Sequence, residues 1–139
     1  MTEIERAVAL AVGEKRIGVA FGDSQTKITV PAATLANDDQ FTENFKQLID
    51  KKNPVAIVIG LPRNSKGQET QQSKYVRNFA ESLKVFNLPI IFQDESLTTI
   101  EAEMLLNLQH VAKQQNRGQV DSKAAALILS DYLEQKYGR

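Results

Sequence analysis

The order of apolar segments along this 139-residue chain predicts an α/β fold with a mixed sheet. Three short apolar stretches follow one another with turn residues between them, and further strands then alternate with helices. The composition, 42% apolar and 24% charged, is that of an ordinary globular protein long enough to bury a core without disulfides. We therefore expect one α/β domain over residues 1–139.

The first three strands are expected to form a hairpin or meander. Gly13 and the cluster at 22–24 supply the turns between them. Pro31 lies in the third stretch and lacks a backbone N–H, which predicts an edge position or a bulge there. The expected strand ranges are 7–12, 17–21 and 28–34.

A helix is expected to follow the meander, with Asp38 or Asp39 as its cap and its end near Asn53. The next strand is expected at 55–59. This segment is almost wholly apolar, as are strands covered on both faces. The sequence Gly-Leu-Pro at 60–62 is expected to end it.

Apolar residues at helical spacing predict a second helix, followed by a fifth strand at 90–92. Thr98 and Glu101 form a capping box that predicts the start of a third helix. The residues that define the second helix are Tyr75, Phe79, Leu83 and Phe86.

The last helix is expected to start near Asp121, after a polar stretch at 109–119. The predicted order is therefore three strands, a helix, a strand, a helix, a strand and two helices. The residues expected to point inward from the last helix are Ala124, Ala125, Ile128, Leu129 and Tyr132.

Composition and motifs exclude several classes of protein. The absence of cysteine excludes thiolate metal sites and fits a reducing compartment, so we expect a cytoplasmic protein. No apolar run reaches the ~18 residues that span a bilayer, so no membrane partner is expected. The chain has no P-loop and no dinucleotide fingerprint. Its one histidine, His110, lies beside the polar stretch and is expected to be solvated rather than a general base.

The formal net charge is zero, which excludes a strongly basic, non-specific nucleic-acid binder. The sum hides a pattern, because basic segments at 61–88 and 109–139 flank an acidic segment at 89–108. Solvated helix faces explain each segment taken alone. An acidic metal site between basic flanks that contact phosphate explains the alternation as a whole.

Two carboxylates are candidate metal ligands. Glu95 follows the fifth strand, where ligands bind in open α/β sheets, and Asp121 stands at the expected start of the last helix. Together they offer the hard oxygen ligands that Mg²⁺ or Mn²⁺ prefers. The structural alternatives are a turn acid for Glu95 and an N-cap for Asp121.

Four motifs, in order, resemble those of the YqgF/RuvX family of Holliday-junction-resolvase-like proteins. The resemblance implies an RNase H-like fold with a five-stranded mixed sheet flanked by helices. It also implies a Mg²⁺- or Mn²⁺-dependent nuclease that matures the 5′ end of pre-16S ribosomal RNA. The motifs are GEKRIGVA at 13–20, VIGLPRNSKG at 58–67, DESLTT at 94–99 and VDSKAAA at 120–126.

The resemblance implies a catalytic, metal-binding triad of which Glu95 and Asp121 are two members. Ala11 stands where the family has the first Asp, so hydrolysis is expected to be weakened by orders of magnitude or lost. Glu14, in the adjacent turn, is a poor substitute, and Asp23 is expected at the far end of the second strand. Ala11 is explained equally by natural degeneration, by a replacement that silences catalysis, or by packing of the strand.

Basic residues inside the motif-bearing segments are candidate phosphate contacts, namely Lys15, Arg16 and Arg117. Ser96 departs from the family, which has Arg at this position. The expected partner is nucleic acid, either pre-rRNA or branched DNA. Two alternatives to the rRNA nuclease stay open: a binding scaffold for ribosome assembly, and a junction resolvase that acts as a homodimer.

Overall fold

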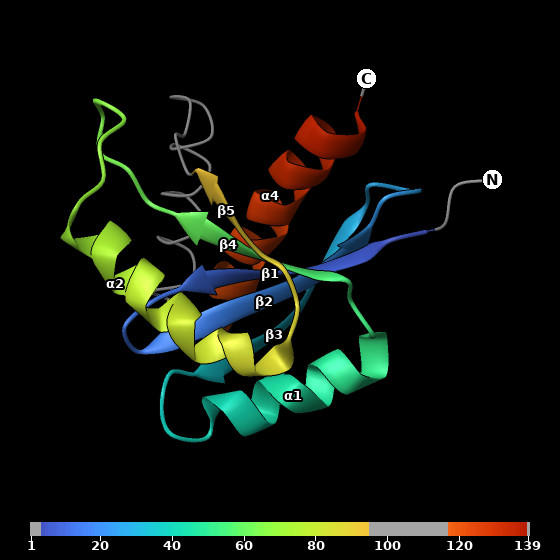
Figure 1. Ribbon diagram of the computed structural model, residues 1–139, viewed down its shortest axis with the longest axis horizontal. Coiled ribbons are helices and arrows are strands. Elements are labelled where there is room, and N and C mark those ends of the chain that lie inside the picture. Colours follow the sequence, from blue (N-terminus) through green and yellow to red (C-terminus); the bar gives the residue numbers. More distant parts are fainter. Residues whose placement is uncertain (1–3, 95–116, 139) are drawn as a thin grey trace.

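The computed structural model describes residues 4–94 and 117–138 and contains the predicted mixed sheet (Figure 1). Its five strands lie in the order β3-β2-β1-β4-β5, which confirms the expected fold class. Each strand extends one or two residues beyond the predicted range at one or both ends, and β3 and β4 begin one residue later than predicted. The strands are β1 (Arg6–Val12), β2 (Arg16–Asp23), β3 (Thr29–Ala36), β4 (Ala56–Leu61) and β5 (Ile90–Asp94).

The sheet combines an antiparallel meander with two parallel strands. β1 pairs with β2 and β2 with β3 in antiparallel register, whereas β4 lies parallel to both β1 and β5. The carboxyl ends of β1, β4 and β5 therefore meet at one edge of the sheet. The turn between β1 and β2 lies at the same edge, because it follows the end of β1.

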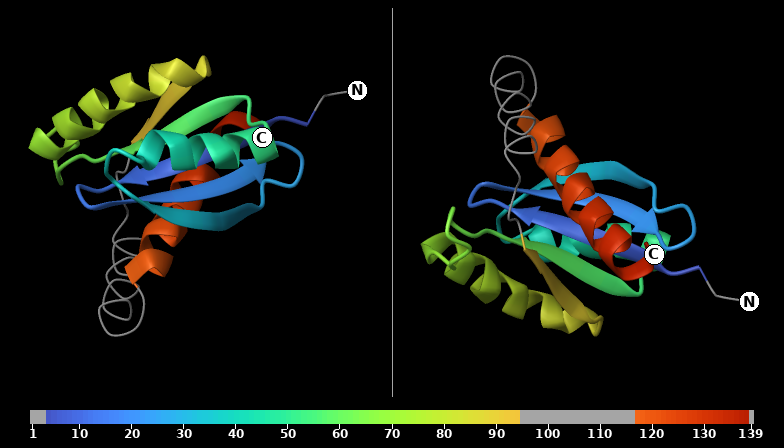
Figure 2. Two further views of the ribbon diagram at one scale, coloured as in Figure 1. Left: turned by 90° about the horizontal axis from the view of Figure 1, so that it is seen from below. Right: turned by 90° about the horizontal axis from the view of Figure 1, so that it is seen from above.

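One face of the sheet is covered by α1 (Phe41–Lys52), α2 (Gln71–Glu81) and the 3-10 helix η1 (Ser82–Phe86), as the view onto this face shows (Figure 2, left). Side chains of the three central strands form the core on this side with residues of these helices. The fully buried members from the strands are Val8, Leu10, Ile17, Val19, Ile57, Ile59 and Leu61.

The opposite face carries α4 (Arg117–Tyr137), which runs diagonally across the sheet (Figure 2). The strand residues below it are small, because alternation along β1 and β2 places alanine and glycine on this face. Small α4 residues lie near its first turns, and the larger Leu129 and Leu133 lie toward its end. None of the described helices is long and apolar enough to cross a membrane.

Gly18 sets how closely α4 approaches β2. A Cβ atom at this position would lie 1.9 Å from the backbone oxygen of Asp121 and 2.8 Å from the nitrogen of Ser122. Because backbone atoms cannot move aside as a flexible side chain can, only glycine allows this contact.

Pro31 lies in the edge strand β3 and also at a bulge. The β2–β3 register pairs Val19 with Ala33 but Ala20 with Pro31, which leaves Ala32 as the extra residue. Both structural consequences expected of this proline are therefore present.

The start of α1 differs from the prediction. Neither Asp38 nor Asp39 is the N-cap, because the helix begins at Phe41 after Gln40, whose side chain forms no cap hydrogen bond. The Asp38 carboxylate instead accepts a hydrogen bond from the Gln40 N–H at 2.9 Å and closes the turn before the helix. Asn53 ends α1 in the left-handed conformation, close to the predicted end.

The second predicted helix is divided into two elements. Thr70 and Ser73 form a capping box at the start of α2, which the sequence pattern did not single out. At the other end the Ser82 N–H bonds to the carbonyl of Phe79, three residues earlier, so the chain tightens into η1. Leu83 stays buried as expected.

The last helix starts earlier than predicted, because the described residues from Arg117 onward, four residues before Asp121, are already helical. Of the residues expected inward, Ala124 is only partly buried, whereas the others are buried. The third predicted helix, opened by Thr98 and Glu101, lies outside the described residues.

Replacement of Gly18 by alanine is expected to lower the free energy of unfolding by about 3 kcal/mol, because α4 must move away from β2. Gly67→Ala is the matched control: nothing lies within 4 Å of a Cβ there, and the cost of its φ of +79° is about 1 kcal/mol. Urea denaturation of both variants measures the difference. Equal losses in the two variants would show that the Gly18 contact is not tight.

Candidate functional site

The carboxyl edge of β1, β4 and β5 is the place where open α/β sheets bind ligands. Three parts of the chain meet near it: the turn from Gly13 to Arg16, the Ala11–Gly18 pair of β1 and β2, and the first turns of α4. This carboxyl edge brings together several of the residues that the sequence motifs single out.

Arg16 and Asp121 form an ion pair at this edge. Arg16 opens β2 on the same face as Gly18, two residues along the strand, and Asp121 lies over Gly18. The Arg16 Nε donates a hydrogen bond to Asp121 Oδ2 at 2.9 Å. The side chains are 37% and 28% exposed, so the pair is partly shielded from solvent and open on one side.

Asp121 is not the N-cap of α4, because the helix already includes the four residues before it, from Arg117. The structural alternative weighed for this residue is therefore wrong. Its carboxylate faces Arg16, across a sequence separation of 105 residues that no local pattern could reveal.

Ala11 lies beside this ion pair. It is the cross-strand neighbour of Gly18 and packs against the small buried residues Ala20, Ala125 and Ala126. It thus continues the row of alanines on the α4 face of β1, as the packing explanation predicts. It contributes a methyl group where the family resemblance expects a carboxylate.

The turn that carries Arg16 is held by contacts that the sequence did not reveal. The Gly13 N–H donates to the Arg16 carbonyl at 2.9 Å, which closes the turn. Asn37 donates from its side chain to the Gly13 carbonyl and to the Tyr75 hydroxyl, both at 2.8 Å. Its backbone N–H donates to the Lys15 carbonyl at 2.9 Å. Strand β3 and helix α2 therefore fix the turn from two sides.

The other predicted site residues are placed as follows. Lys15 and Glu14 are exposed in the turn. Arg117 is the first residue of α4, and its side chain lies outside what the structure describes, as does Glu95. Asp23 pairs with Arg6 at the opposite end of β1, as expected of a poor substitute for the missing carboxylate.

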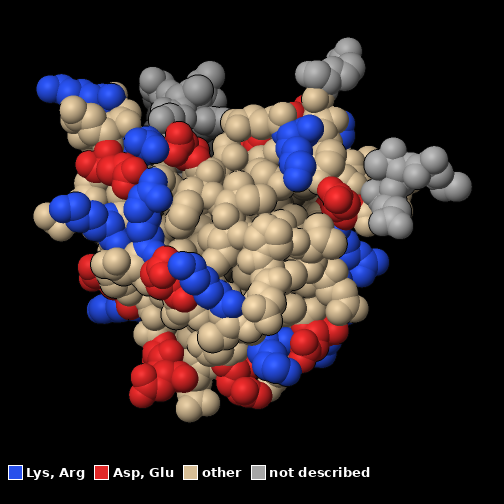
Figure 3. Space-filling view, in the orientation of Figure 1, with Lys and Arg blue, Asp and Glu red and all other residues tan. Residues whose placement is uncertain are grey.

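A second group of charges lies over α2 and the loop before it, where Lys and Arg alternate with Asp and Glu on the surface (Figure 3). Arg63 Nε donates to Asp94 Oδ1 at 2.9 Å and links this loop to the end of β5. Arg77 binds both carboxylate oxygens of Glu69 at 2.7 and 2.8 Å, and this hydrogen bonding lowers the pKa of Glu69. These arginines already have carboxylate partners.

The carboxylates of the described residues do not suit a firmly held divalent cation. In residues 4–94 and 117–138, no three histidine, aspartate or glutamate side chains come together as metal ligands. Asp121 already has Arg16 as its counter-ion, and Ala11 has no oxygen to offer. Since Mg²⁺ needs octahedral oxygen coordination, we assign no reaction step to a cation here.

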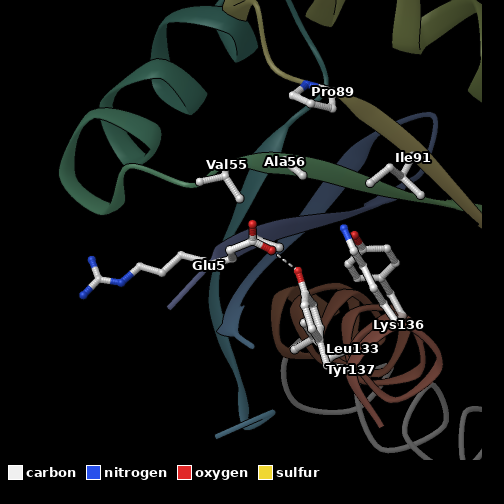
Figure 4. A pocket seen from close by; sticks show the side chains of 11 residues that line it. Glu5, Val55, Ala56, Pro89, Ile91, Leu133, Lys136 and Tyr137 are labelled. Carbon is white, nitrogen blue, oxygen red and sulfur yellow. Dashed lines mark hydrogen bonds between the residues drawn. The ribbon is translucent and has the colours of Figure 1, made fainter. Parts of the chain in front are cut away.

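A cavity of about 200 Å³ lies at the opposite end of the sheet (Figure 4). Its walls mix apolar with polar and charged side chains. Tyr137 donates to the Glu5 carboxylate, and Lys136 lies over the Tyr137 ring, 5.4 Å from its centroid. The Glu5–Tyr137 hydrogen bond links the last residue of α4 to the residue that precedes β1. We interpret this region as part of the packing.

Comparison with known proteins identifies relatives along nearly the whole chain. Residues 5–135 match the family model described as RuvX, Holliday junction resolvase. A protein of Gloeothece citriformis is 38% identical over 98% of this chain and 92% of its own length. One of Thermoanaerobacter pseudethanolicus is 37% identical over 93% of this chain and 96% of its own. Both are named "Putative pre-16S rRNA nuclease".

Solved structures share the fold at low sequence identity. RuvC of T. thermophilus, in complex with a Holliday junction substrate, superposes with a TM-score of 0.58 and 11% identity over 96% of each chain. Fowlpox virus resolvase with junction DNA gives a TM-score of 0.51 and 12% identity, covering 94% of this chain and 97% of its own. The arrangement of strands and helices is thus that of these resolvases.

Tyr137→Phe is expected to lower the free energy of unfolding by about 1 kcal/mol at pH 8, through loss of the hydrogen bond to Glu5. Burial, and then this hydrogen bond, raise the pKa of Tyr137 above 10.0. Its contribution is therefore complete below pH 10 and is lost as the pH rises through the folded-state pKa. Denaturation between pH 8 and 11 should show a smaller difference between wild type and variant at the alkaline end. A constant difference would contradict this assignment.

Proposed function

Since this chain belongs to the RuvX family of Holliday junction resolvase-like proteins, we propose that it is a nuclease acting on pre-16S ribosomal RNA in the cytoplasm. The observation that carries the proposal is the identity of 37–38%, over more than nine-tenths of the chain, to relatives named "Putative pre-16S rRNA nuclease". The family match spans residues 5–135 and so includes the segments that carry both Arg16 and Asp121.

We propose Lys15, Arg16 and Arg117 as the contacts to the RNA backbone. Lys15 and Arg16 lie in the turn at the carboxyl edge, and Arg117 opens the helix that brings Asp121 to the same place. Contacts of this kind position a nucleic acid without reading its sequence. The choice of cleavage site would then depend on the shape of the RNA or on a partner.

Hydrolysis by this chain is proposed to be weak because of Ala11. Any Mg²⁺ or Mn²⁺ has to be held by Glu95 and Asp121 without the carboxylate that the family has at this position. A divalent cation, when bound, activates water and stabilises the leaving oxygen of a phosphodiester. Ala11 and the Arg16 counter-ion of Asp121 both disfavour its binding, and no three metal-ligating side chains come together in the described residues.

A second candidate function is RNA binding without hydrolysis, as a scaffold in ribosome assembly. The alanine packing around Ala11 favours it, because this part of the site is built as a hydrocarbon surface. A resolvase acting as a homodimer is the remaining alternative. Sedimentation with and without junction DNA distinguishes that alternative, since paired cuts require two copies on one junction.

Ala11→Asp is expected to raise Mn²⁺-dependent cleavage of a pre-16S rRNA substrate by at least about tenfold, because it supplies the missing ligand. Ala11→Asn is the matched control: it has the same shape and no charge, and is expected to leave cleavage near the wild-type rate. Gel analysis of labelled RNA measures the rates, and thermal unfolding checks that both variants fold.

The outcome separates the two candidate functions. Cleavage restored by Ala11→Asp alone supports the weakened nuclease. RNA binding that persists in a folded Ala11→Asp variant without any cleavage would favour the scaffold.

A further inference from the structure

We propose that Asp121 acts in this chain as a positioning residue for Arg16, and that the pair forms a cation-independent docking site for one phosphodiester group. The inference deepens the proposed function and rests on it, because it concerns how the same edge of the sheet binds RNA. The inference differs from the proposed function in the role of Asp121, whose carboxylate here orients Arg16 and does not bind a metal ion.

The ion pair uses only one of the three nitrogens of the Arg16 guanidinium. Only Nε of Arg16 bonds to Asp121, at 2.9 Å, and the two terminal nitrogens form no hydrogen bond with any described residue. The side chain is 37% exposed. The four N–H groups of these two nitrogens thus have no partner among the described residues, on a side chain whose direction is already set.

A phosphodiester group matches this arrangement. Its two non-bridging oxygens can accept parallel hydrogen bonds from a guanidinium, which is the bidentate geometry that makes arginine a preferred phosphate ligand. A lysine could pair with Asp121 or with phosphate, but its single ammonium group has no rigid fork to serve both at once.

Both partners of the pair stand on backbone that cannot easily move. Asp121 is fixed because its carbonyl lies against Gly18, and Arg16 is fixed because Asn37 holds the turn at Gly13 and Lys15. A side chain ordered before binding loses less conformational entropy when RNA arrives. The structure thus provides a pre-organised phosphate ligand.

Among the described residues, the charge balance at this position favours an anion. Asp121 is neutralised by Arg16, the exposed Lys15 adds a positive charge in the same turn, and Ala11 adds no negative one. Glu14 is the nearest unpaired acid in the turn, and it is exposed and bonded to no described residue. Replacement of Glu14 therefore serves as a control that removes one negative charge from the turn without changing the partner of Arg16.

Removal of the Asp121 carboxylate changes the affinity for RNA in opposite directions, depending on whether Asp121 only repels the RNA or positions Arg16. Removing a carboxylate near RNA normally strengthens binding, because one repulsion disappears. If Asp121 positions Arg16, Asp121→Asn weakens binding instead. The loss should also vanish when Arg16 has been replaced, since there is then no side chain to position.

The test measures binding of a fluorescein-labelled oligouridylate by anisotropy at low salt, once with EDTA and once with Mn²⁺. Asp121→Asn is expected to weaken binding in EDTA by about three- to tenfold, and Glu14→Gln to leave it unchanged or tighten it. Arg16→Gln and the Arg16→Gln/Asp121→Asn double variant are expected to bind equally weakly. Circular dichroism confirms that each variant is folded.

Four results of these binding measurements would overturn the inference, and they differ in what they mean for the proposed function. Tighter or unchanged binding by Asp121→Asn overturns the positioning role, and so does an additional loss in the double variant. Wild-type binding that appears only with Mn²⁺ overturns cation independence but leaves the proposed function intact. No wild-type binding under either condition overturns both the inference and the proposed function.

Discussion

The contact between β2 and α4 at Gly18 is the constraint on which the rest of this molecule depends. It allows helix backbone to lie directly on strand backbone, so the sheet has two unlike faces, one covered by bulky side chains and one by alanine and glycine. The same contact sets the position of Asp121 and so its distance to Arg16. Packing and site geometry therefore have a single structural cause.

Much of the fold was predictable because it is encoded in local patterns. The meander, the buried strand β4 and the edge position of Pro31 follow from alternation, apolar runs and the chemistry of proline. The residues at which helices start were harder to predict from the sequence. Asp38 and Asp121 are common N-cap types, yet one closes a turn and the other lies a turn inside α4, because their partners are set by the surrounding fold.

The site was predictable in its location but not in its bonding. Motif order placed Arg16 and Asp121 near the same edge, whereas their direct ion pair and the Asn37 hydrogen bonds join residues far apart in the sequence. Local spacing cannot indicate which of several carboxylates an arginine selects. The prediction of Glu95 as a ligand stays a prediction, since this residue lies outside the described part of the chain.

The bulge at Pro31 has a consequence for association between copies. An edge strand exposes backbone groups that can pair with another chain and extend the sheet. In β3 the proline removes one donor, and the extra residue Ala32 interrupts the register after Val19. Continuous strand addition along this side is therefore blocked, although Val30 leaves an apolar side chain exposed there. The edge is protected against sheet-to-sheet aggregation by backbone chemistry rather than by charge.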